Sequence, residues 1–157
     1  MTDLRWLDGD EERSAVARRV LEALKDWFEV DRTREGYIAD CAGWPVVAAF
    51  DGDTPVGFLA LKATSPYAVE IAVMGVIRAY HRRDIGRRLF EAARDRAREE
   101  GYRFMQVKTV REGVYPEYDA TNRFYRKLGF LELEVFETLW DEANPCQVYV
   151  MALGSGL

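Results

Sequence analysis

The segment that most constrains the fold of this chain is a helical pattern flanked by two apolar runs. Residues 69–77 and 103–110 are rich in the apolar and β-branched residues that favour strands. Between them, small and aliphatic residues recur every four positions over 85–97, and Gly101 follows as a helix terminator. Two strands joined through a helix normally lie parallel in one sheet. The sequence therefore predicts one parallel strand pair.

Shorter patterns on either side predict antiparallel neighbours for that pair. Residues 45–50 and 55–63 are apolar runs joined by Asp51-Gly52-Asp53, which is a strong signal for a hairpin. The other expected elements are a helix over 11–28 with Asp10 as its N-cap, a short helix near 37–41, a helix over 119–128, and strands from 131 and over 148–152. Together they predict an α/β (α+β) fold with a mixed, mostly antiparallel sheet.

Apolar and acidic residues alternate in the expected strand that starts at Leu131. The order is Leu131, Glu132, Leu133, Glu134 and Val135. This alternation is typical of a strand with one buried face. Residues 138–146 then predict a long connection to the last strand.

The composition is that of a compact globular protein. The 157 residues are 48% hydrophobic, and 22 Lys and Arg against 27 Asp and Glu give a formal net charge of -5. A disordered chain would be less hydrophobic, and a dedicated nucleic-acid binder would carry a basic surplus. We expect a single domain over residues 1–157.

Targeting and disulfide signals are weak. The sequence holds no apolar run long enough to span a membrane, and residues 1–6 lack the apolar stretch of a secretory signal. Two cysteines, Cys41 and Cys146, are too few for disulfide bonds to stabilise a domain of this size. We therefore expect free thiols and a reducing, cytoplasmic location. With His81 as the single histidine, no zinc site is expected.

A basic loop connects the first strand of the parallel pair to the helix that follows. It holds four arginines within seven positions, namely Arg82, Arg83, Arg87 and Arg88. The first N–H groups of a helix have no partner inside the helix, and together with the helix dipole they form an anion site. Arginine side chains add groups that pair with phosphate. The alternative is a solvated basic loop that only caps the helix.

Two motifs resemble those of the GNAT family of N-acetyltransferases. The stretch from His81 to Gly86 is similar to the family's acetyl-CoA-binding motif, Arg/Gln-x-x-Gly-x-Gly/Ala, although His81 replaces Arg or Gln and Asp84 replaces the first Gly. Residues 125–130 resemble the family's Tyr-x-x-x-Gly-Phe signature. Both motifs occur in the family's order, and the resemblance spans residues 1–153.

The resemblance implies a GNAT fold with about six to seven strands and about four helices. It also implies an enzyme that moves an acetyl group from acetyl-CoA to a primary amine on a small molecule, by direct attack in a ternary complex. The alternatives are an acetyltransferase for protein lysines or N-termini, and a CoA-binding regulatory module without catalysis. A nucleic-acid-binding helix over 78–98 ranks last, because acidic residues dilute its charge.

By the same resemblance, acetyl-CoA binds along the strand end and the basic loop. Backbone groups of Val76 and Ile77 would pair with the pantetheine arm, and an N–H there would polarise the thioester carbonyl. The loop residues expected to contact the phosphates are His81, Arg82, Arg83, Asp84, Ile85, Gly86 and Arg87. Many relatives carry Asn where this chain has Tyr118, and Thr121 or Asn122 would replace that contact.

Two residues are expected to move protons. An alkyl amine has a reference pKa of about 10.4, so a base is useful at neutral pH. Glu70 is the only carboxylate in its apolar strand, and its position resembles that of the catalytic glutamate of histone-acetylating relatives. The alternatives for Glu70 are a surface position or an ion pair with an arginine. By resemblance, Tyr125 would donate a proton to the leaving thiolate; the alternative is an aromatic core residue.

The acceptor side has fewer signals. By resemblance, the segment that starts at Tyr37 and the connection 138–146 lie near the acceptor. Trp140 would form an apolar wall, while Asp141 would hold a cationic amine. The alternatives are a tryptophan that anchors the connection or a dimer contact, so a homodimer stays open. A nucleic acid, a membrane or a metal ion is not expected as a partner.

Overall fold

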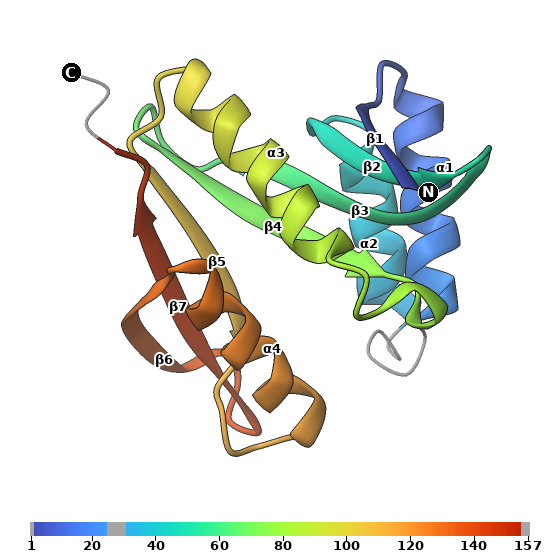
Figure 1. Ribbon diagram of the computed structural model, residues 1–157. Coiled ribbons are helices and arrows are strands. Elements are labelled where there is room, and N and C mark those ends of the chain that lie inside the picture. Colours follow the sequence, from blue (N-terminus) through green and yellow to red (C-terminus); the bar gives the residue numbers. More distant parts are fainter. Residues whose placement is uncertain (1, 25–30, 155–157) are drawn as a thin grey trace. The chain divides into compact units, whose positions relative to one another are not determined.

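The computed structural model describes residues 2–24 and 31–154 (Figure 1). The strands are β1 (Thr2–Trp6), β2 (Val46–Asp51), β3 (Thr54–Ala63), β4 (Ala68–Val76), β5 (Phe104–Val110), β6 (Leu131–Asp141) and β7 (Asn144–Ala152). The helices are α1 (Asp10–Ala23), α2 (Asp31–Cys41), α3 (Ile85–Glu99) and α4 (Pro116–Leu128), with a short 3-10 helix at Arg78–Tyr80.

The described strands form one seven-stranded sheet in the order β1-β2-β3-β4-β5-β7-β6. β4 and β5 pair in parallel, from Ala68 beside Phe104 to Ile71 beside Val107. The pairs β1–β2, β2–β3, β5–β7 and β6–β7 are antiparallel. The predicted fold class, with one parallel pair in a mostly antiparallel sheet, is confirmed.

The chain divides into two compact units. The first comprises Met1–Lys62 and Ala72–Arg96, and the second comprises Ala63–Ile71 and Ala97–Leu157. The expectation of a single domain over the whole chain stays a prediction.

Helix α1 buries one face in the core of the first unit. Its buried residues are Val16, Ala17, Val20 and Leu21, at the predicted helical spacing. They share this core with Val46, Ala48 and Phe58 of β2 and β3. Gly75 of β4 lies close to this helix, since a Cβ atom there would come within 2.9 Å of Leu24 Cδ1. A side chain at position 75 would therefore push the side chains of Leu24 and Val20 aside.

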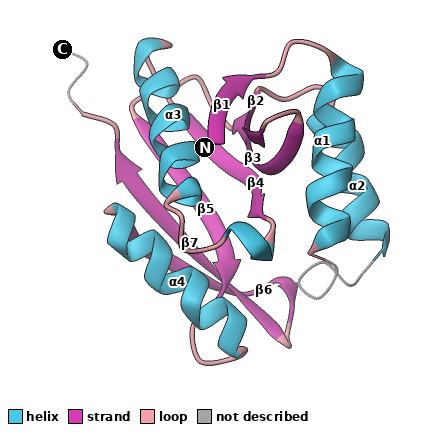
Figure 2. Cartoon of the chain, turned by 45° about the vertical axis from the view of Figure 1, so that its right-hand side comes forward, coloured by secondary structure: helices cyan, strands magenta, loops and turns pink. Residues whose placement is uncertain are grey.

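Helix α4 covers strands of the second unit (Figure 2). Its buried residues are Asn122 and Tyr125, which are 0% and 6% exposed. The helix ends at Gly129, whose φ of 106° is the left-handed conformation that favours glycine. Phe130 follows, 2% exposed, and its ring packs edge-on against Tyr125. The Gly-Phe pair therefore ends the helix and anchors the chain that leaves it.

The N-terminal boundaries differ from the predicted ones. β1 was not predicted. Its residues nevertheless alternate in exposure, since Leu4 and Trp6 are partly buried while Asp3 and Arg5 are exposed. Gly9, not Asp10, is the N-cap of α1. The described part of α1 ends at Ala23, and the predicted extension to Phe28 falls outside the described residues. α2 is longer than the predicted short helix and begins at Asp31.

The C-terminal boundaries also need correction. α4 begins at Pro116, three residues before the predicted start, because proline at the first helical position has no N–H that would need a partner. The predicted long connection over 138–146 is wrong: β6 continues to Asp141 and β7 begins at Asn144, so a tight hairpin joins them. The predicted buried face of β6 is also wrong, because Leu131 is 70% exposed and Leu133 60% exposed.

Candidate active site

The C-terminal end of β4 presents one backbone edge away from β3. The Ile77 N–H donates to Val56 O of β3 at 2.9 Å, and Ile77 O accepts from Tyr80 N–H at 2.8 Å. Because backbone groups alternate along a strand, the N–H and C=O of Val76 point to the opposite edge. His81 Nε2 lies 2.6 Å from Val76 O on that edge. The geometry favours the N–H of Val76, and not the backbone of Ile77, as the group that can bind an extended ligand, since Val76 O already contacts His81.

The basic loop is shaped by two residues in the left-handed conformation. Arg82 and Asp84 both have φ of 64°, although neither is glycine. Asp84 O accepts the N–H of Arg88 at 3.1 Å, which places Asp84 at the N-terminal cap of α3. Ile85 is 1% exposed and fixes the first turn in the first unit. Gly86 is the second residue of α3, and the first N–H groups of this helix have no partner inside it.

The four arginines of this region have different surroundings. Arg88 donates to Thr2 Oγ1 at 2.8 Å and to Thr2 O at 3.1 Å, so it fastens α3 to β1. Arg83 lies over the ring of Tyr80, 5.0 Å from its centroid. Arg87 Nε pairs with Asp84 Oδ1 at 3.5 Å. Within residues 2–24 and 31–154, the exposed Arg82 side chain has no recorded partner.

Glu70 forms an ion pair within the second unit. Lys108 Nζ of β5 donates to Glu70 Oε1 at 3.0 Å, and the Glu70 side chain is 12% exposed. Glu70 therefore forms an ion pair with a lysine, where the sequence suggested an arginine as the alternative partner, and its role as a base stays a prediction. The sequence did not indicate Lys108, because the strand register that brings it close to Glu70 is a tertiary feature.

Tyr125 has an apolar, aromatic environment in the second unit. Its ring lies 5.6 Å from Phe124, 5.8 Å from Phe130 and 6.1 Å from Tyr149, centroid to centroid. Burial raises the pKa of the Tyr125 hydroxyl above its ordinary value. Across the described residues, no hydrogen bond to this hydroxyl is recorded. The phenol therefore stays protonated at neutral pH and can donate to an incoming acceptor.

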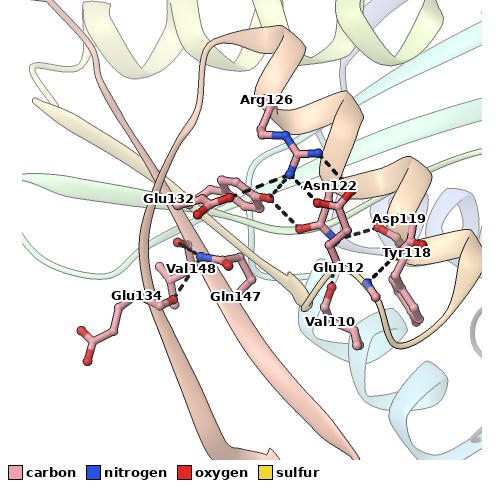
Figure 3. Close-up of polar contacts among 12 residues, drawn as sticks. Val110, Glu112, Tyr118, Asp119, Asn122, Arg126, Glu132, Glu134, Gln147 and Val148 are labelled. Carbon is pink, nitrogen blue, oxygen red and sulfur yellow. Dashed lines mark hydrogen bonds and ion pairs between the residues drawn. The ribbon is translucent and has the colours of Figure 1, made fainter.

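The predicted cofactor contact of Asn122 is not supported. Its Nδ2 donates to Val110 O at 2.9 Å and to Tyr118 O at 2.7 Å, and its Oδ1 accepts from Tyr149 Oη at 2.6 Å (Figure 3). These bonds use both amide hydrogens and the carbonyl oxygen, and the residue is 0% exposed. Asn122 therefore has a structural role. Thr121 donates to Glu117 O of its own helix at 3.2 Å.

The residues that continue this network were not predicted from the sequence. Tyr149 of β7 is fully buried, and Arg126 Nη1 donates to its hydroxyl at 3.2 Å. Arg126 also pairs with Glu112 Oε2 at 3.0 Å and with Glu132 Oε1 at 3.9 Å (Figure 3). Tyr149 was missed because it sits in an apolar strand where tyrosine is an ordinary strand former.

The predicted acceptor residues belong to different units. Tyr37 of α2 packs against the core of the first unit. Trp140 of β6 is 45% exposed in the second unit. Asp141 accepts from Asn144 Nδ2 at 2.9 Å and 3.1 Å, which closes the β6–β7 hairpin. Their expected role in acceptor binding stays a prediction.

Neither a metal centre nor a membrane span is found in the described part of the chain. No group of three or more His, Cys, Asp or Glu side chains in residues 2–24 and 31–154 has an arrangement suited to a metal ion. The helices formed by these residues are too short or too polar to cross a bilayer. Cys41 and Cys146 are buried free thiols, as predicted.

Comparison with known proteins supports the motif-based resemblance. Residues 3–130 match the acetyltransferase (GNAT) family. N-alpha-acetyltransferase RimI of Mycobacterium tuberculosis is 36% identical over 113 residues, or 70% of this chain. The match covers 66% of that protein, just under two thirds of its length.

Solved structures share the fold at low sequence identity. A GNAT-family protein from Desulfovibrio desulfuricans aligns with a TM-score of 0.78 and 17% identity, over 98% of this chain and 100% of its own. An aminoglycoside 6'-N-acetyltransferase complexed with coenzyme A aligns with a TM-score of 0.76 and 16% identity, over 98% of each chain. The sequence motifs, the sheet topology and these matches agree, and the chain belongs to the acetyltransferase (GNAT) family.

Proposed function

We propose that this protein binds acetyl-CoA at the end of β4 and the loop before α3, and transfers the acetyl group to a primary amine. The observation that carries the proposal is the start of α3. There Arg82 and Asp84, both left-handed, lead the chain from β4 into the first turn of a helix. Unpaired N–H groups at such a turn bind a diphosphate, and the exposed Arg82 side chain adds a cation.

The reaction forms a C–N bond and breaks a C–S bond. The free amine attacks the thioester carbonyl carbon, and negative charge builds on the carbonyl oxygen. In this proposal the N–H of Val76 stabilises that charge. CoA leaves as a thiolate, so the amine must lose one proton and the sulfur must gain one.

Tyr125 is the proposed proton donor for the thiolate. The phenol is protonated at neutral pH, because its ordinary pKa is about 10 and burial raises that pKa further, so a proton is available when the thiolate leaves. Tyr125→Phe is expected to lower kcat by about 100-fold, since a positioned acid contributes at least that much, and to leave the affinity for acetyl-CoA within about twofold. Steady-state kinetics measure kcat, and calorimetric titration measures the affinity for acetyl-CoA. Equal losses in both would remove the acid role.

Glu70 is the proposed proton acceptor for the amine, acting directly or through water. A carboxylate accepts a proton only in its ionised form, and Lys108 lies 3.0 Å from it. The same ion pair also serves the sheet, because it joins β4 to β5. The catalytic role of Glu70 therefore has less support than that of Tyr125, because the Glu70 carboxylate already has a structural partner.

The proposed acceptor is a primary amine, and the first candidate is an amine on a small molecule. The similarity to an N-alpha-acetyltransferase favours a second candidate, the α-amino group of a peptide. The aminoglycoside enzyme shares 16% identity, which supports the fold and not the acceptor. Trp140 and Asp141 are proposed to contact either kind of amine.

Release of CoA thiol with a panel of amines tests the proposal. The panel holds diamines, amino sugars and short peptides with free or blocked N-termini, each with acetyl-CoA. Thiol release with a free amine, and none with its blocked form, is the expected result. If acetyl-CoA binds and no amine or peptide releases thiol, the chain is a CoA-binding module without catalysis. Absence of binding in calorimetry would contradict the whole proposal.

A further inference from the structure

Tyr149 links β7 to the helix that carries Tyr125. Its hydroxyl donates to Asn122 Oδ1 at 2.6 Å, and both residues are 0% exposed. Asn122 in turn donates to Val110 O of β5 at 2.9 Å. One side chain of α4 is thus bonded to two adjacent strands of the second unit (Figure 3).

The same tyrosine also touches Tyr125 directly. The two rings lie 6.1 Å apart, with an angle of 49° between their planes. Asn122 and Tyr125 are three residues apart on α4, so both face the sheet from the same side of the helix. Tyr149 therefore holds α4 through the hydrogen bond from its hydroxyl to Asn122, and its ring packs beside Tyr125 together with Phe124 and Phe130.

Arg126 supports this arrangement from the next position along the helix. Its Nη1 donates to Tyr149 Oη at 3.2 Å, and Glu112 holds the guanidinium at 3.0 Å. The Tyr149 oxygen thus accepts one hydrogen bond and donates another. Its proton is directed toward Asn122, because the guanidinium can only donate.

We propose that Tyr149 is a positioning residue for proton transfer: through Asn122 and ring contact it holds Tyr125 where its hydroxyl meets the leaving sulfur. This inference rests on the proposed function, in which Tyr125 is the acid. Tyr149 has no contact with substrate in the proposal, and its effect on catalysis passes entirely through Tyr125.

A double-mutant cycle tests the inference. Tyr149→Phe keeps the ring and removes the hydroxyl, and it is expected to lower kcat about tenfold with the KM for acetyl-CoA unchanged, because small displacements of a catalytic group have effects of this size. In the Tyr125→Phe background the same change is expected to have no further effect on kcat. Tyr67→Phe is the matched control, since Tyr67 is 61% exposed in the same unit, and it is expected to leave kcat unchanged.

The outcomes separate this inference from the proposed function. If Tyr149→Phe lowers kcat by the same factor in both backgrounds, Tyr149 does not act through Tyr125 and the inference is overturned, while the acid role stands. If Tyr125→Phe itself has wild-type kcat, the acid role fails first and the inference fails with it. A purely structural Tyr149 would change the melting temperature and leave kcat intact, which also overturns the inference.

A second variant covers the case in which Tyr149→Phe does not fold. Arg126→Gln removes the other partner of the Tyr149 hydroxyl at a position whose side chain is 36% exposed. It is expected to lower kcat by about threefold, because Tyr125 would be displaced less than in Tyr149→Phe. This loss is expected only when Tyr125 is present. An equal loss in the Tyr125→Phe background would count against the inference.

Discussion

Asp84 shows how a single residue can depart from a family motif and still keep its geometry. The family motif has glycine at this position, and the φ of 64° explains why, since glycine adopts left-handed backbone at no steric cost. Aspartate tolerates this conformation better than most residues. Its carboxylate pairs with Arg87, which keeps the negative charge near a cation at the edge of the proposed phosphate site.

Asp84→Gly is therefore expected to help both the fold and the cofactor site. Loss of the left-handed strain should raise the free energy of unfolding by about 0.5 kcal/mol. Loss of the carboxylate releases Arg87, so the affinity for acetyl-CoA should be unchanged or tighter in a calorimetric titration. Arg82→Gly is the matched control, since it relieves the same strain but removes a cation, and it should bind acetyl-CoA more weakly. A clear loss of affinity in Asp84→Gly would show that the carboxylate contributes to binding.

At the residue scale, the sequence predicted backbone geometry better than side-chain partners. The helix start after Asp84 follows from the local apolar spacing, and it is present. Asn122 was predicted to face the cofactor but is buried, because its partners Val110 and Tyr149 lie in other elements. Partners that come from distant strands depend on register, which a local pattern does not contain.

Strand β6 is an edge strand whose alternating pattern did not lead to burial. The order of the sheet places it last, beside β7 alone. Leu131 and Leu133 remain exposed, while Val148 of β7 is 2% exposed. Alternation identified the strand correctly, but whether a face is buried depends on the layer above it.

Substitutions in the two strands should therefore differ sharply in effect. Leu133→Thr is expected to change the free energy of unfolding by no more than about 0.5 kcal/mol, because the leucine is exposed and threonine is a good strand former. Val148→Ala should cost about 2 kcal/mol, because it leaves a cavity in the buried sheet. Urea titrations followed by circular dichroism measure both. A large loss in Leu133→Thr would mean that a partner covers this strand in solution.

At the element scale, strong apolar periodicity was sufficient to predict a helix or strand, and weak periodicity was not. The parallel pair, the β2–β3 hairpin and α3 follow from apolar spacing and turn chemistry. β1 is only five residues long, and its pairing with β2 is what defines it. The β6–β7 hairpin was missed because Asn144-Pro145 resembles a turn, whereas both residues start a strand.

At the scale of the whole molecule, four buried groups among residues 2–24 and 31–154 favour the protonated form in the folded chain. Burial raises the pKa of the Cys41 thiol to about 12, and it raises the pKa of Cys146, Tyr125 and Tyr149 as well. In the unfolded chain these groups ionise near their ordinary values of about 8.5 for thiols and 10 for tyrosines. Unfolding at alkaline pH therefore releases protons.

The free energy of unfolding is expected to fall as the pH rises above about 8.5, with no contribution from these groups at lower pH. The sign follows because the folded state then binds more protons than the unfolded state. Urea unfolding at several pH values between 7 and 10.5 measures the slope. Cys41→Ala should flatten the part between about pH 8.5 and 10, where the thiols titrate first. An unchanged slope in that variant would show that Cys41 ionises equally in both states.

The bonds from Arg88 to Thr2 have a practical consequence for handling the protein. They connect the second residue of the chain to the first turns of α3, the helix that follows the proposed phosphate loop. A purification tag fused ahead of Thr2 would be attached directly to the residue that Arg88 binds, so it can disturb these two hydrogen bonds. Affinity measurements on CoA compounds are best made after such a tag has been cleaved.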